Sequence, residues 1–339
     1  MYIGVIYSST NSVMQGREKE KLADDEILDT AVAVKSALEK KGHQVDLVTF
    51  EPNQTEGFSQ YEWIFNLAET IRGFPLAEYE VAVKLEELGI PFTGSGSETL
   101  LTCVHKSSAK TLIQKYGILT PQFQKVNPGE KIKTGLEFPL IVKPDHEDGS
   151  IGIKDDSVVY SIPELTRKVS EIHQVYEQAA LVEEFIEGRD ISASLIGNGK
   201  DLAVLPLSEI VFSEDYIGPK ILTFEEKWDA ESQAYQKSVS QCPCSLEESS
   251  QTEIKKIAKK VFNIFGCRDY ALVDFRLKGD IPYVIEVNPN PCINPINSGF
   301  ITAGAVYGFD YDEIISEILN QSMLNRNKVP QRGSHGDRD

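Results

Sequence analysis

Two short apolar segments late in the chain, each carrying one acidic residue with another polar residue two positions later, constrain the fold more than any other feature. The first contains Asp274-Phe275-Arg276 and the second contains Glu286-Val287-Asn288. If Lys278-Gly279-Asp280 closes a β-hairpin between them, Asp274 and Glu286 lie nearly opposite each other. Side-chain alternation then places Arg276 and Asn288 on the same face. Two facing carboxylates repel each other unless a cation offsets their charge.

This face of the hairpin has two interpretations. Asp274, Glu286 and Asn288 would offer the hard oxygen ligands that Mg²⁺ prefers, with Arg276 neutralising further charge. Alternatively, the acids are incidental and the face is simply solvated. Both interpretations expect the apolar residues between them to face the core. These are Ala271, Val273, Phe275, Tyr283, Ile285 and Val287.

A lysine and a glycine-containing loop suggest a site for phosphates. Lys143 ends the apolar run 138–142, where it is poorly placed for casual solvation and well placed to hold a phosphate as a point charge. The loop Asp148-Gly149-Ser150-Ile151-Gly152 follows it, and its backbone N–H groups could cap phosphates. For the loop alone, an ordinary turn is the competing interpretation. Residues 181–190, taken alone, indicate an edge strand with solvated acids.

The hydrophobic pattern divides the chain into two parts. Strands at 2–7, 45–50 and 63–66 alternate with helices at 27–42 and about 77–88, which favours a parallel α/β layer. Later, helices are expected at 104–116, 163–177, 248–265 and 310–319, and strands at 140–143, 181–186, 191–196 and 202–211. Asn198-Gly199 indicates a hairpin turn. Residues 213–247 lack periodicity and are expected to form a lid or a disordered loop, and the tail from Gln321 is expected to be disordered.

Composition and charge exclude several classes of protein. The 339 residues carry 52 acidic and 34 basic side chains, a net charge of −18, which disfavours nucleic acid as a partner. No apolar run approaches the roughly 20 residues of a membrane span, and the apolar segment 2–7 lacks the features of a signal peptide. The five cysteines, including Cys242 and Cys244, favour free thiols over disulfides or zinc. A cytoplasmic location is therefore expected.

Several motifs, in this order, resemble the ATP-grasp superfamily and specifically its D-alanine–D-alanine ligase-like branch. The likeness covers roughly residues 60–320. Any one motif is weak, but the ordered set is highly specific. The motifs are Phe65-Asn66-Leu67-Ala68-Glu69, Ile90-Pro91-Phe92-Thr93-Gly94-Ser95, Lys106 with Gly117-Ile118-Leu119-Thr120-Pro121, Ile141-Val142-Lys143-Pro144, residues 182–190, Asp274-Phe275-Arg276 and Glu286-Val287-Asn288-Pro289-Asn290-Pro291.

The resemblance implies an α/β plus α+β architecture: an ATP-grasp fold with a parallel α/β N-terminal domain. The expected divisions are residues 1–95 for that domain, 96–180 for a small ATP-grasp lobe and 181–322 for a C-terminal lobe with the metal site. Residues 323–339 are expected to form a disordered tail. ATP would lie between the two ATP-grasp lobes.

The resemblance also assigns residues to roles. Lys106 and Lys143 would contact the nucleotide, Glu183, Glu184 and Ile186 would line the adenine pocket, and Asp190 would take the ribose hydroxyls. Asp274, Glu286 and Asn288 would hold two Mg²⁺ ions, a ligand set that would also suit Mn²⁺. Lys227 resembles the γ-phosphate lysine of the mobile loop, Ser150 belongs to a second candidate lid, and Arg276 would stabilise an oxyanion. Glu69, Ser298 and Gly299 would bind the substrate.

The implied reaction is an ATP-dependent, peptide-bond-forming ligation. A carboxylate attacks the γ-phosphate to give an acyl phosphate, which an amine then attacks. Because both first reactants are anions, lysines and Mg²⁺ must offset their repulsion. The expected partners are small acid and amine substrates, with no nucleic acid or membrane, and ligases of this branch are often homodimers.

Departures from the branch concern the substrate. Its glycine- and glutamate-containing motif after the first strand has no counterpart in Tyr7-Ser8-Ser9-Thr10-Asn11. The arginine two residues before the metal aspartate is Leu272, and the glycine after the Asn-x-x-Pro run is Cys292. Three hypotheses follow: a ligase for an amino acid or related acid other than D-alanine alone, a D-alanine–D-alanine ligase with substituted contacts, and an inactive nucleotide-binding regulator. The complete set of lysines and metal ligands disfavours the third.

Overall fold

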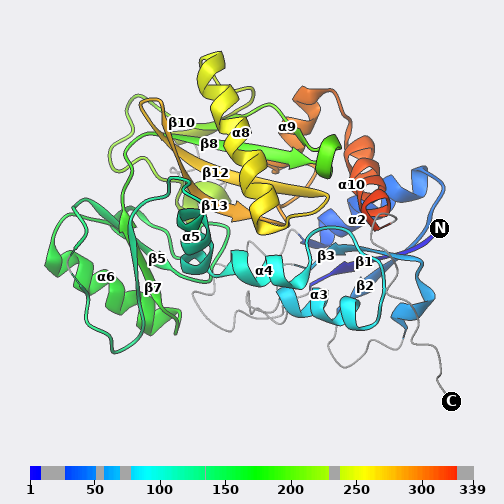
Figure 1. Ribbon diagram of the computed structural model, residues 1–339, viewed down its shortest axis with the longest axis horizontal. Coiled ribbons are helices and arrows are strands. Elements are labelled where there is room, and N and C mark those ends of the chain that lie inside the picture. Colours follow the sequence, from blue (N-terminus) through cyan, green and yellow to red (C-terminus); the bar gives the residue numbers. More distant parts are fainter. Residues whose placement is uncertain (9–26, 51–56, 69–77, 134, 229–236, 327–339) are drawn as a thin grey trace.

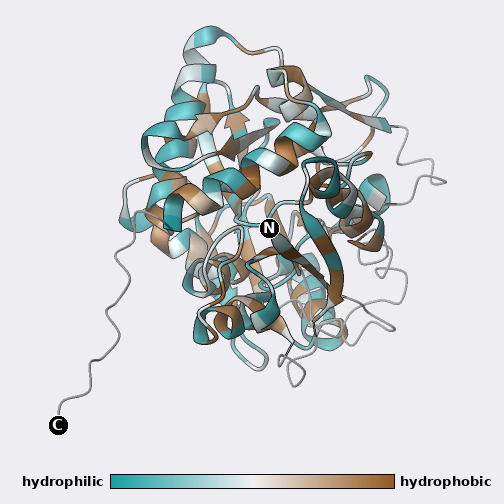
Figure 2. Ribbon diagram, turned by 90° about the vertical axis from the view of Figure 1, so that its right-hand side faces the viewer, coloured by the Kyte–Doolittle hydropathy of each residue, from teal (hydrophilic) through white to brown (hydrophobic). Residues whose placement is uncertain are grey.

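The computed structural model describes residues 1–8, 27–50, 57–68, 78–133, 135–228 and 237–326. Within these residues the strands form sheets of three, four and six strands. Figure 1 shows them side by side: the four-stranded sheet with α6 at the left, the six-stranded sheet crossed by α8 in the middle, and the three-stranded sheet at the right. Apolar residues gather on the strands and on the inward faces of the helices (Figure 2).

The three-stranded sheet is parallel, as predicted. It contains β1 (Tyr2–Tyr7), β2 (Gln44–Thr49) and β3 (Trp63–Leu67) in the order β2-β1-β3. Helix α2 (Ile27–Lys40) buries one apolar stripe against one side of the sheet, and α3 (Glu78–Glu87) contributes to the core on the other. The short η2 (Phe58–Gln60) precedes β3.

The four-stranded sheet has the order β4-β7-β5-β6 and is antiparallel. Its strands are β4 (Phe123–Val126), β5 (Leu140–Pro144), β6 (Val158–Val159) and β7 (Ala180–Glu184). Helix α6 (Ile162–Val175) covers one face, and η4 (Asp155–Ser157) precedes β6. The Ser161 hydroxyl caps the start of α6 by accepting from the Glu164 N–H.

The six-stranded sheet carries the acidic hairpin in its order β11-β10-β8-β12-β13, with β9 paired to β8. Its strands are β8 (Arg189–Ile196), β9 (Ala203–Val204), β10 (Ser208–Phe212), β11 (Ser238–Gln241), β12 (Tyr270–Lys278) and β13 (Ile281–Asn288). Helix α8 (Glu248–Phe265) packs on one face, and Gly266 ends it in the left-handed conformation. The turn η5 (Gly199–Asp201) joins β8 to β9, where the Asn198-Gly199 turn was predicted.

The structure corrects four expectations about individual elements. The helix expected at 104–116 is α5 (Lys106–Lys115), and a separate helix that was not expected, α4 (Ser97–Val104), precedes it across His105. The strand expected at 202–211 is broken between β9 and β10, where Pro206 has no N–H to donate. Residues 213–247 contain α7 (Phe224–Trp228) and β11.

The fourth correction concerns the end of the chain. Residues 321–326, expected to be disordered, belong to α10 (Tyr311–Arg326), which follows α9 (Gly299–Tyr307). Ser322 is buried and donates a hydrogen bond to the carbonyl of Phe92 at 3.0 Å. The last turn is held by contacts with the N-terminal sheet that local sequence does not reveal.

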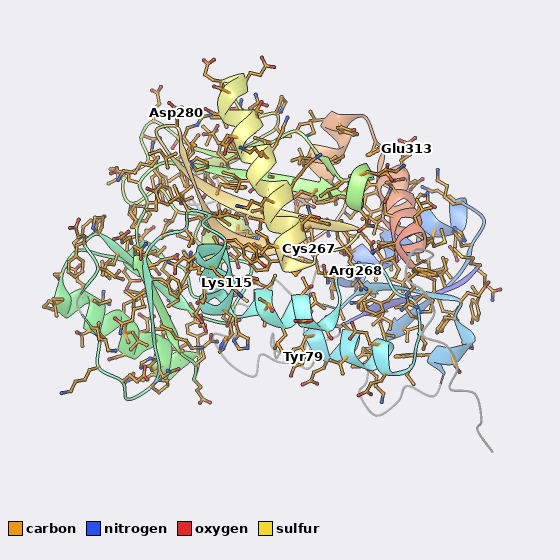
Figure 3. The ribbon with its side chains drawn as sticks, viewed as in Figure 1. Tyr79, Lys115, Cys267, Arg268, Asp280 and Glu313 are labelled. Carbon is orange, nitrogen blue, oxygen red and sulfur yellow. The ribbon has the colours of Figure 1, made fainter. Side chains whose placement is uncertain are left out.

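Contacts between the three sheets cross the boundaries expected from the sequence. Strand β7 straddles the expected division between residues 180 and 181 and pairs with β4 and β5. Helices α9 and α10 share one core with α2 and β1. Arg268, just after α8 (Figure 3), donates from Nε to the carbonyl of Gly94 at 3.0 Å and lies over the Phe92 ring. The division into three domains stays a prediction.

None of the helices in the described part of the chain is long and apolar enough to cross a membrane.

Candidate functional site

A cavity of about 560 Å³ lies between the four-stranded and six-stranded sheets, and each sheet forms one side of it. Every candidate residue that the structure describes lines this cavity. One further candidate, Glu69, lies outside the described residues. The lining residues among the candidates are Lys106, Lys143, Ser150, Glu183, Glu184, Ile186, Asp190, Lys227, Asp274, Arg276, Glu286, Asn288, Ser298 and Gly299. Its volume falls within the range of ligand sites in proteins.

The hairpin β12–β13 places Asp274 directly opposite Glu286, which confirms the predicted register. A β-bulge between Asp274 and Phe275 shifts the register by one residue and so brings Asp274 opposite Glu286. The bulge also changes which residues of β13 face the core. Val284 and Val287 are buried, whereas Ile285 lines the cavity beside Glu286. The expectation that Tyr283 and Ile285 face the core is therefore wrong, because one extra residue shifts the alternation.

Negative charge is concentrated at Asp274 and Glu286. The pKa of Asp274 is raised to about 7, mainly by burial; the nearby Asp190 and Glu286 carboxylates add to the rise, and a hydrogen bond from Ser192 opposes it. Burial and the neighbouring Asp148 also raise the pKa of Glu286. Two crowded carboxylates with raised pKa values, and Asn288 on the same cavity wall, form an oxygen ligand set that fits Mg²⁺.

Lys106, at the start of α5, connects the loop after β5 to strand β13. Its ammonium lies 2.9 Å from Asp148 Oδ1 and forms an ion pair with Glu286. Burial would lower the pKa of Lys106, but these two carboxylates outweigh that effect and raise it. The lysine is therefore charged at neutral pH and lies beside the crowded carboxylates of the hairpin.

A second lysine pair surrounds Glu183, and the sequence analysis missed half of it. Lys143 Nζ and Lys110 Nζ each lie 2.6 Å from one oxygen of Glu183, and all three side chains are buried. Burial lowers the pKa of Lys110 to about 8, with Glu183 opposing and Lys143 adding to the shift. Lys110 follows Lys106 by four residues on one helix, so helical spacing could have placed both on the same face.

The two candidate lids meet above the cavity. Ser150 has a φ of 63° and donates from Oγ to the carbonyl of Leu222 at 2.9 Å. The Phe224 N–H donates to the carbonyl of Ile153. Helix α7 then carries Lys227, which lines the cavity; its charge adds to that of Lys106 in lowering the pKa of Asp148 and opposes the rise in the pKa of Asp274. The glycine loop and the segment before Lys227 thus form one continuous cover.

Arg276 points toward Asp190, the residue that the family resemblance assigns to the ribose hydroxyls of the nucleotide. Its guanidinium lies 3.2 Å from Asp190 Oδ2 and donates to the carbonyls of Gly188 and Lys220 at 3.1 and 2.7 Å. Arg276 therefore holds the segment before α7 against the large sheet. Leu272, on the same strand, also lines the cavity and offers no charged group.

The start of α9 forms the opposite end of the cavity. Ser298 caps this helix: its Oγ accepts from the Ile301 N–H at 3.2 Å and donates to the carbonyl of Cys292. Gly299 is the first residue of the helix. Helix N-termini favour anions, because their first N–H groups have no partner within the helix. A substrate carboxylate would be stabilised here.

Comparison with known proteins identifies related sequences along most of the chain. The family model described as the D-ala D-ala ligase C-terminus matches residues 109–320. The chain is 36% identical to an uncharacterized protein, y4sG, of Sinorhizobium fredii, over 76% of this chain and 73% of that protein. It is 30% identical to a D-alanine–D-alanine ligase of Methylacidiphilum infernorum, over 88% of this chain and 90% of that enzyme.

Solved structures show the same fold. The D-alanine–D-alanine ligase of Bacillus anthracis, complexed with ATP, matches with a TM-score of 0.75 at 21% identity. The match covers 97% of this chain and 99% of that one. The chain therefore has the ATP-grasp fold, with its parallel sheet in the N-terminal part.

Lys110→Met should weaken both the fold and the nucleotide site. Removing one partner from a buried ion pair costs about 3 kcal/mol or more, because the remaining charge stays buried. Glu183 would then bind Lys143 alone and draw it from the phosphates. We expect a lower melting temperature and a higher KM for ATP. Lys115→Met, at an exposed position of the same helix, is the control. Equal melting temperatures and ATP constants for both variants would contradict this role.

Asp274→Asn should stabilise the metal-free protein at alkaline pH. The native carboxyl keeps its proton up to about pH 7, whereas an unfolded aspartate loses it near pH 4. The native state thus binds more protons between these values, so stability falls as pH rises toward 7. We expect the variant to melt at least about 2 °C above the parent at pH 8, and less so at pH 5.5. A difference independent of pH would exclude this electrostatic origin.

Proposed function

The chain belongs to the D-alanine–D-alanine ligase family of ATP-dependent carbon–nitrogen ligases, and we propose that it activates a small carboxylic acid as an acyl phosphate and joins it to an amine. Cationic side chains from the small lobe and carboxylates from the β12–β13 hairpin converge on one cavity. This convergence is the observation that carries the proposal, since phosphoryl transfer to a carboxylate requires both kinds of charge.

ATP would lie along the cavity with its phosphates at the lysines. Lys106 and Lys143 offer charge from two different elements, and the loop at Gly149 and Ser150 offers backbone N–H groups above them. Glu183 and Glu184 end β7, and Ile186 follows two residues later; all three would line the adenine end, partly through backbone atoms. Asp190 would accept the ribose hydroxyls, in competition with its ion pair to Arg276.

Mg²⁺ would be held by Asp274, Glu286 and Asn288. These ligands would hold two ions, and Mn²⁺ would also suit them. When bound, Mg²⁺ supplies positive charge that offsets the repulsion between the phosphates and the attacking carboxylate. Lys106 would then shift its pairing from Glu286 toward the phosphates. The raised pKa values of Asp274 and Glu286 support a cation at this position.

Two chemical steps follow. A carboxylate oxygen of the acid bonds to the γ-phosphorus of ATP, and ADP leaves. The amine nitrogen then bonds to the acyl carbon, the phosphate leaves, and the nitrogen loses a proton. Lys227 would neutralise charge on the transferred phosphoryl group. The hydrogen bond between Ser150 and Leu222 closes the cover, which would keep water from the acyl phosphate.

The residues at the substrate end of the cavity support an acid–amine substrate pair other than two D-alanine molecules. The family's arginine two residues before the metal aspartate is Leu272 here, and Leu272 lines the cavity. A missing charged donor is worth about 1.5–3 kcal/mol. Arg276 would serve as oxyanion stabiliser only after leaving Asp190, because its guanidinium is engaged there. Ser298 and Gly299 would hold a substrate carboxylate at the start of α9.

D-alanine–D-alanine ligation is the second candidate. Named relatives such as the ligases of Pelotomaculum thermopropionicum and Methylacidiphilum infernorum carry that activity in their names. A regulator without turnover is disfavoured, because the full set of lysines and candidate metal ligands that phosphoryl transfer requires lines one cavity. Small-molecule substrates are the expected partners. A homodimer and a cytoplasmic location stay predictions from the family.

The function is tested by ATP consumption with panels of acids and amines. We expect ADP release to depend on adding both, and D-alanine alone to be a poor substrate compared with another pair. Glu286→Gln, which removes a charge from the Mg²⁺ ligands, is the inactive control and should lower kcat at least about 100-fold. Efficient synthesis of D-alanyl-D-alanine with no better pair would overturn the substrate claim alone. ADP release without any acid would overturn the ligase proposal.

A further inference from the structure

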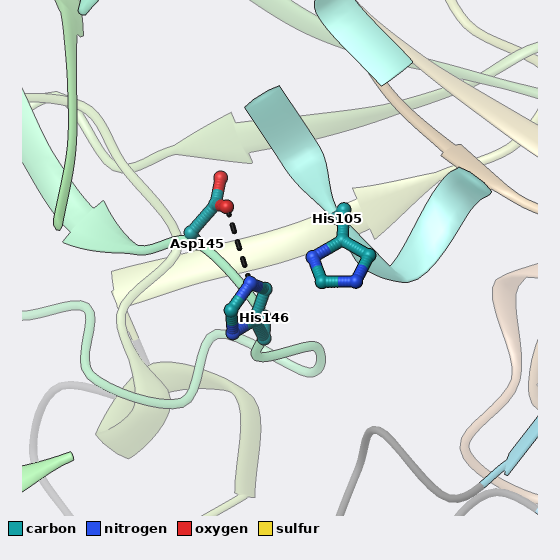
Figure 4. A group of neighbouring side chains, drawn as sticks. All are labelled: His105, Asp145 and His146. Carbon is teal, nitrogen blue, oxygen red and sulfur yellow. Dashed lines mark ion pairs between the residues drawn. The ribbon is translucent and has the colours of Figure 1, made fainter. Parts of the chain in front are cut away.

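A cluster of two histidines and an aspartate lies behind the lysine-bearing wall of the cavity. His105 separates α4 from α5, whereas Asp145 and His146 follow β5 directly. One possible ligand atom of each residue lies within 4.8 Å of the others. Figure 4 shows the three side chains grouped in a triangle, with a dashed line marking the ion pair between Asp145 and His146. None of the three residues lines the nucleotide cavity.

The main chain holds this cluster in place. The Asp145 N–H donates to the carbonyl of Ala179, and the Asp145 carbonyl accepts from the Lys106 N–H, both at 3.0 Å. The His146 N–H donates to Gln178 Oε1 at 2.8 Å. The start of α5 and the end of β5 are thus joined by backbone bonds. The side chains converge without having to be gathered by a ligand.

The His146 ring has unsatisfied polar atoms. Its Nδ1 and Nε2 are buried and make no hydrogen bond. Nε2 forms an ion pair with Asp145 Oδ2 at 3.2 Å, drawn as a dashed line in Figure 4, whereas Nδ1 has neither a hydrogen bond nor an ion pair. The His105 ring packs edge to face against the His146 ring, with centroids 4.3 Å apart. Leaving a buried ring nitrogen without a partner costs free energy that a ligand would recover.

The histidines are suited to bind a metal ion. Each imidazole ring offers two nitrogens, and an unprotonated ring nitrogen carries the lone pair that a metal ion binds. Imidazole nitrogen together with a carboxylate suits Zn²⁺ and related transition metals, whereas Mg²⁺ demands oxygen ligands. Three protein ligands leave a fourth position for water.

We propose that His105, Asp145 and His146 form a binding site for a divalent transition-metal ion of the Zn²⁺ class, separate from the Mg²⁺ ligands of the hairpin. The ion would cross-link the helix that begins with Lys106 to the strand that carries Lys143. This site does not depend on the proposed ligase activity, because it uses none of the residues assigned to ATP or substrate.

Lys125 competes with the ion for Asp145. Its Nζ lies 2.8 Å from Asp145 Oδ2, and Ser107 donates to both carboxylate oxygens, at 2.8 Å from its N–H and 2.9 Å from Oγ. Lys125 belongs to the edge strand β4, and its side chain is 35% exposed, so it can turn to solvent when a dication replaces its charge. Ser107 and Lys125 also line an open groove of about 1110 Å³, which gives an ion access.

The test is a titration of the nucleotide-free full chain with Co²⁺, in the presence of excess Mg²⁺ to occupy the oxygen ligands of the hairpin. We expect one equivalent of Co²⁺ to bind with the strong visible absorption of a nitrogen-ligated, four-coordinate ion. His105→Ala and His146→Ala should each weaken binding at least about tenfold. Lys125→Ala should tighten it, because it removes the competing cation. His43→Ala, His173→Ala and His335→Ala are matched controls.

Three results would overturn the site. They are no Co²⁺ binding under excess Mg²⁺, equal loss in the control variants, and weaker binding in Lys125→Ala. Thermal melting with and without Zn²⁺ guards against misfolded variants: the parent and Lys125→Ala should melt at a higher temperature with Zn²⁺. A folded His105→Ala or His146→Ala protein should show no such rise, and a rise as large as the parent's would contradict the proposal.

Discussion

The ion pair between Lys106 and Glu286 is the contact on which the arrangement of the cavity depends. It joins the first residue of α5 to the acidic hairpin of the large sheet, and so connects this helix to the candidate metal ligands. Neither charge could be buried alone at acceptable cost. The same logic applies to Glu183 between Lys110 and Lys143. The cavity is therefore lined by charges that neutralise one another and that ATP with Mg²⁺ would re-pair.

The sequence predicted much of this architecture because hydrophobic alternation and turn residues are local signals. They were sufficient for the parallel N-terminal sheet and for the register that sets Asp274 against Glu286. They were insufficient for the bulge that turns Ile285 into the cavity, because a bulge adds one residue without a distinctive residue type. The last turn of α10 depends on distant contacts such as Ser322 with Phe92.

In the site, too, some features follow from local sequence signals and others depend on contacts between distant residues. Candidate residues named from ordered motifs line one cavity, but Lys110 became evident only from its ion pair with Glu183. The orientation of Arg276 toward Asp190 could not be read from strand alternation, since it depends on carbonyls of Gly188 and Lys220. Charges needed for ATP chemistry are present together. Leu272 stands where the family resemblance expects an arginine, and the substrate proposal rests on this difference.

The central claim is that ATP activates the acid as an acyl phosphate, and isotope transfer tests it most directly. The acid of the best acid–amine pair is labelled with ¹⁸O in its carboxylate, and the phosphate released during turnover is analysed by mass. We predict that one ¹⁸O atom moves from the carboxylate to phosphate for each amide bond formed, because the attacking oxygen stays on phosphorus when the amine displaces it. Amide formation with unlabelled phosphate would contradict an acyl phosphate intermediate.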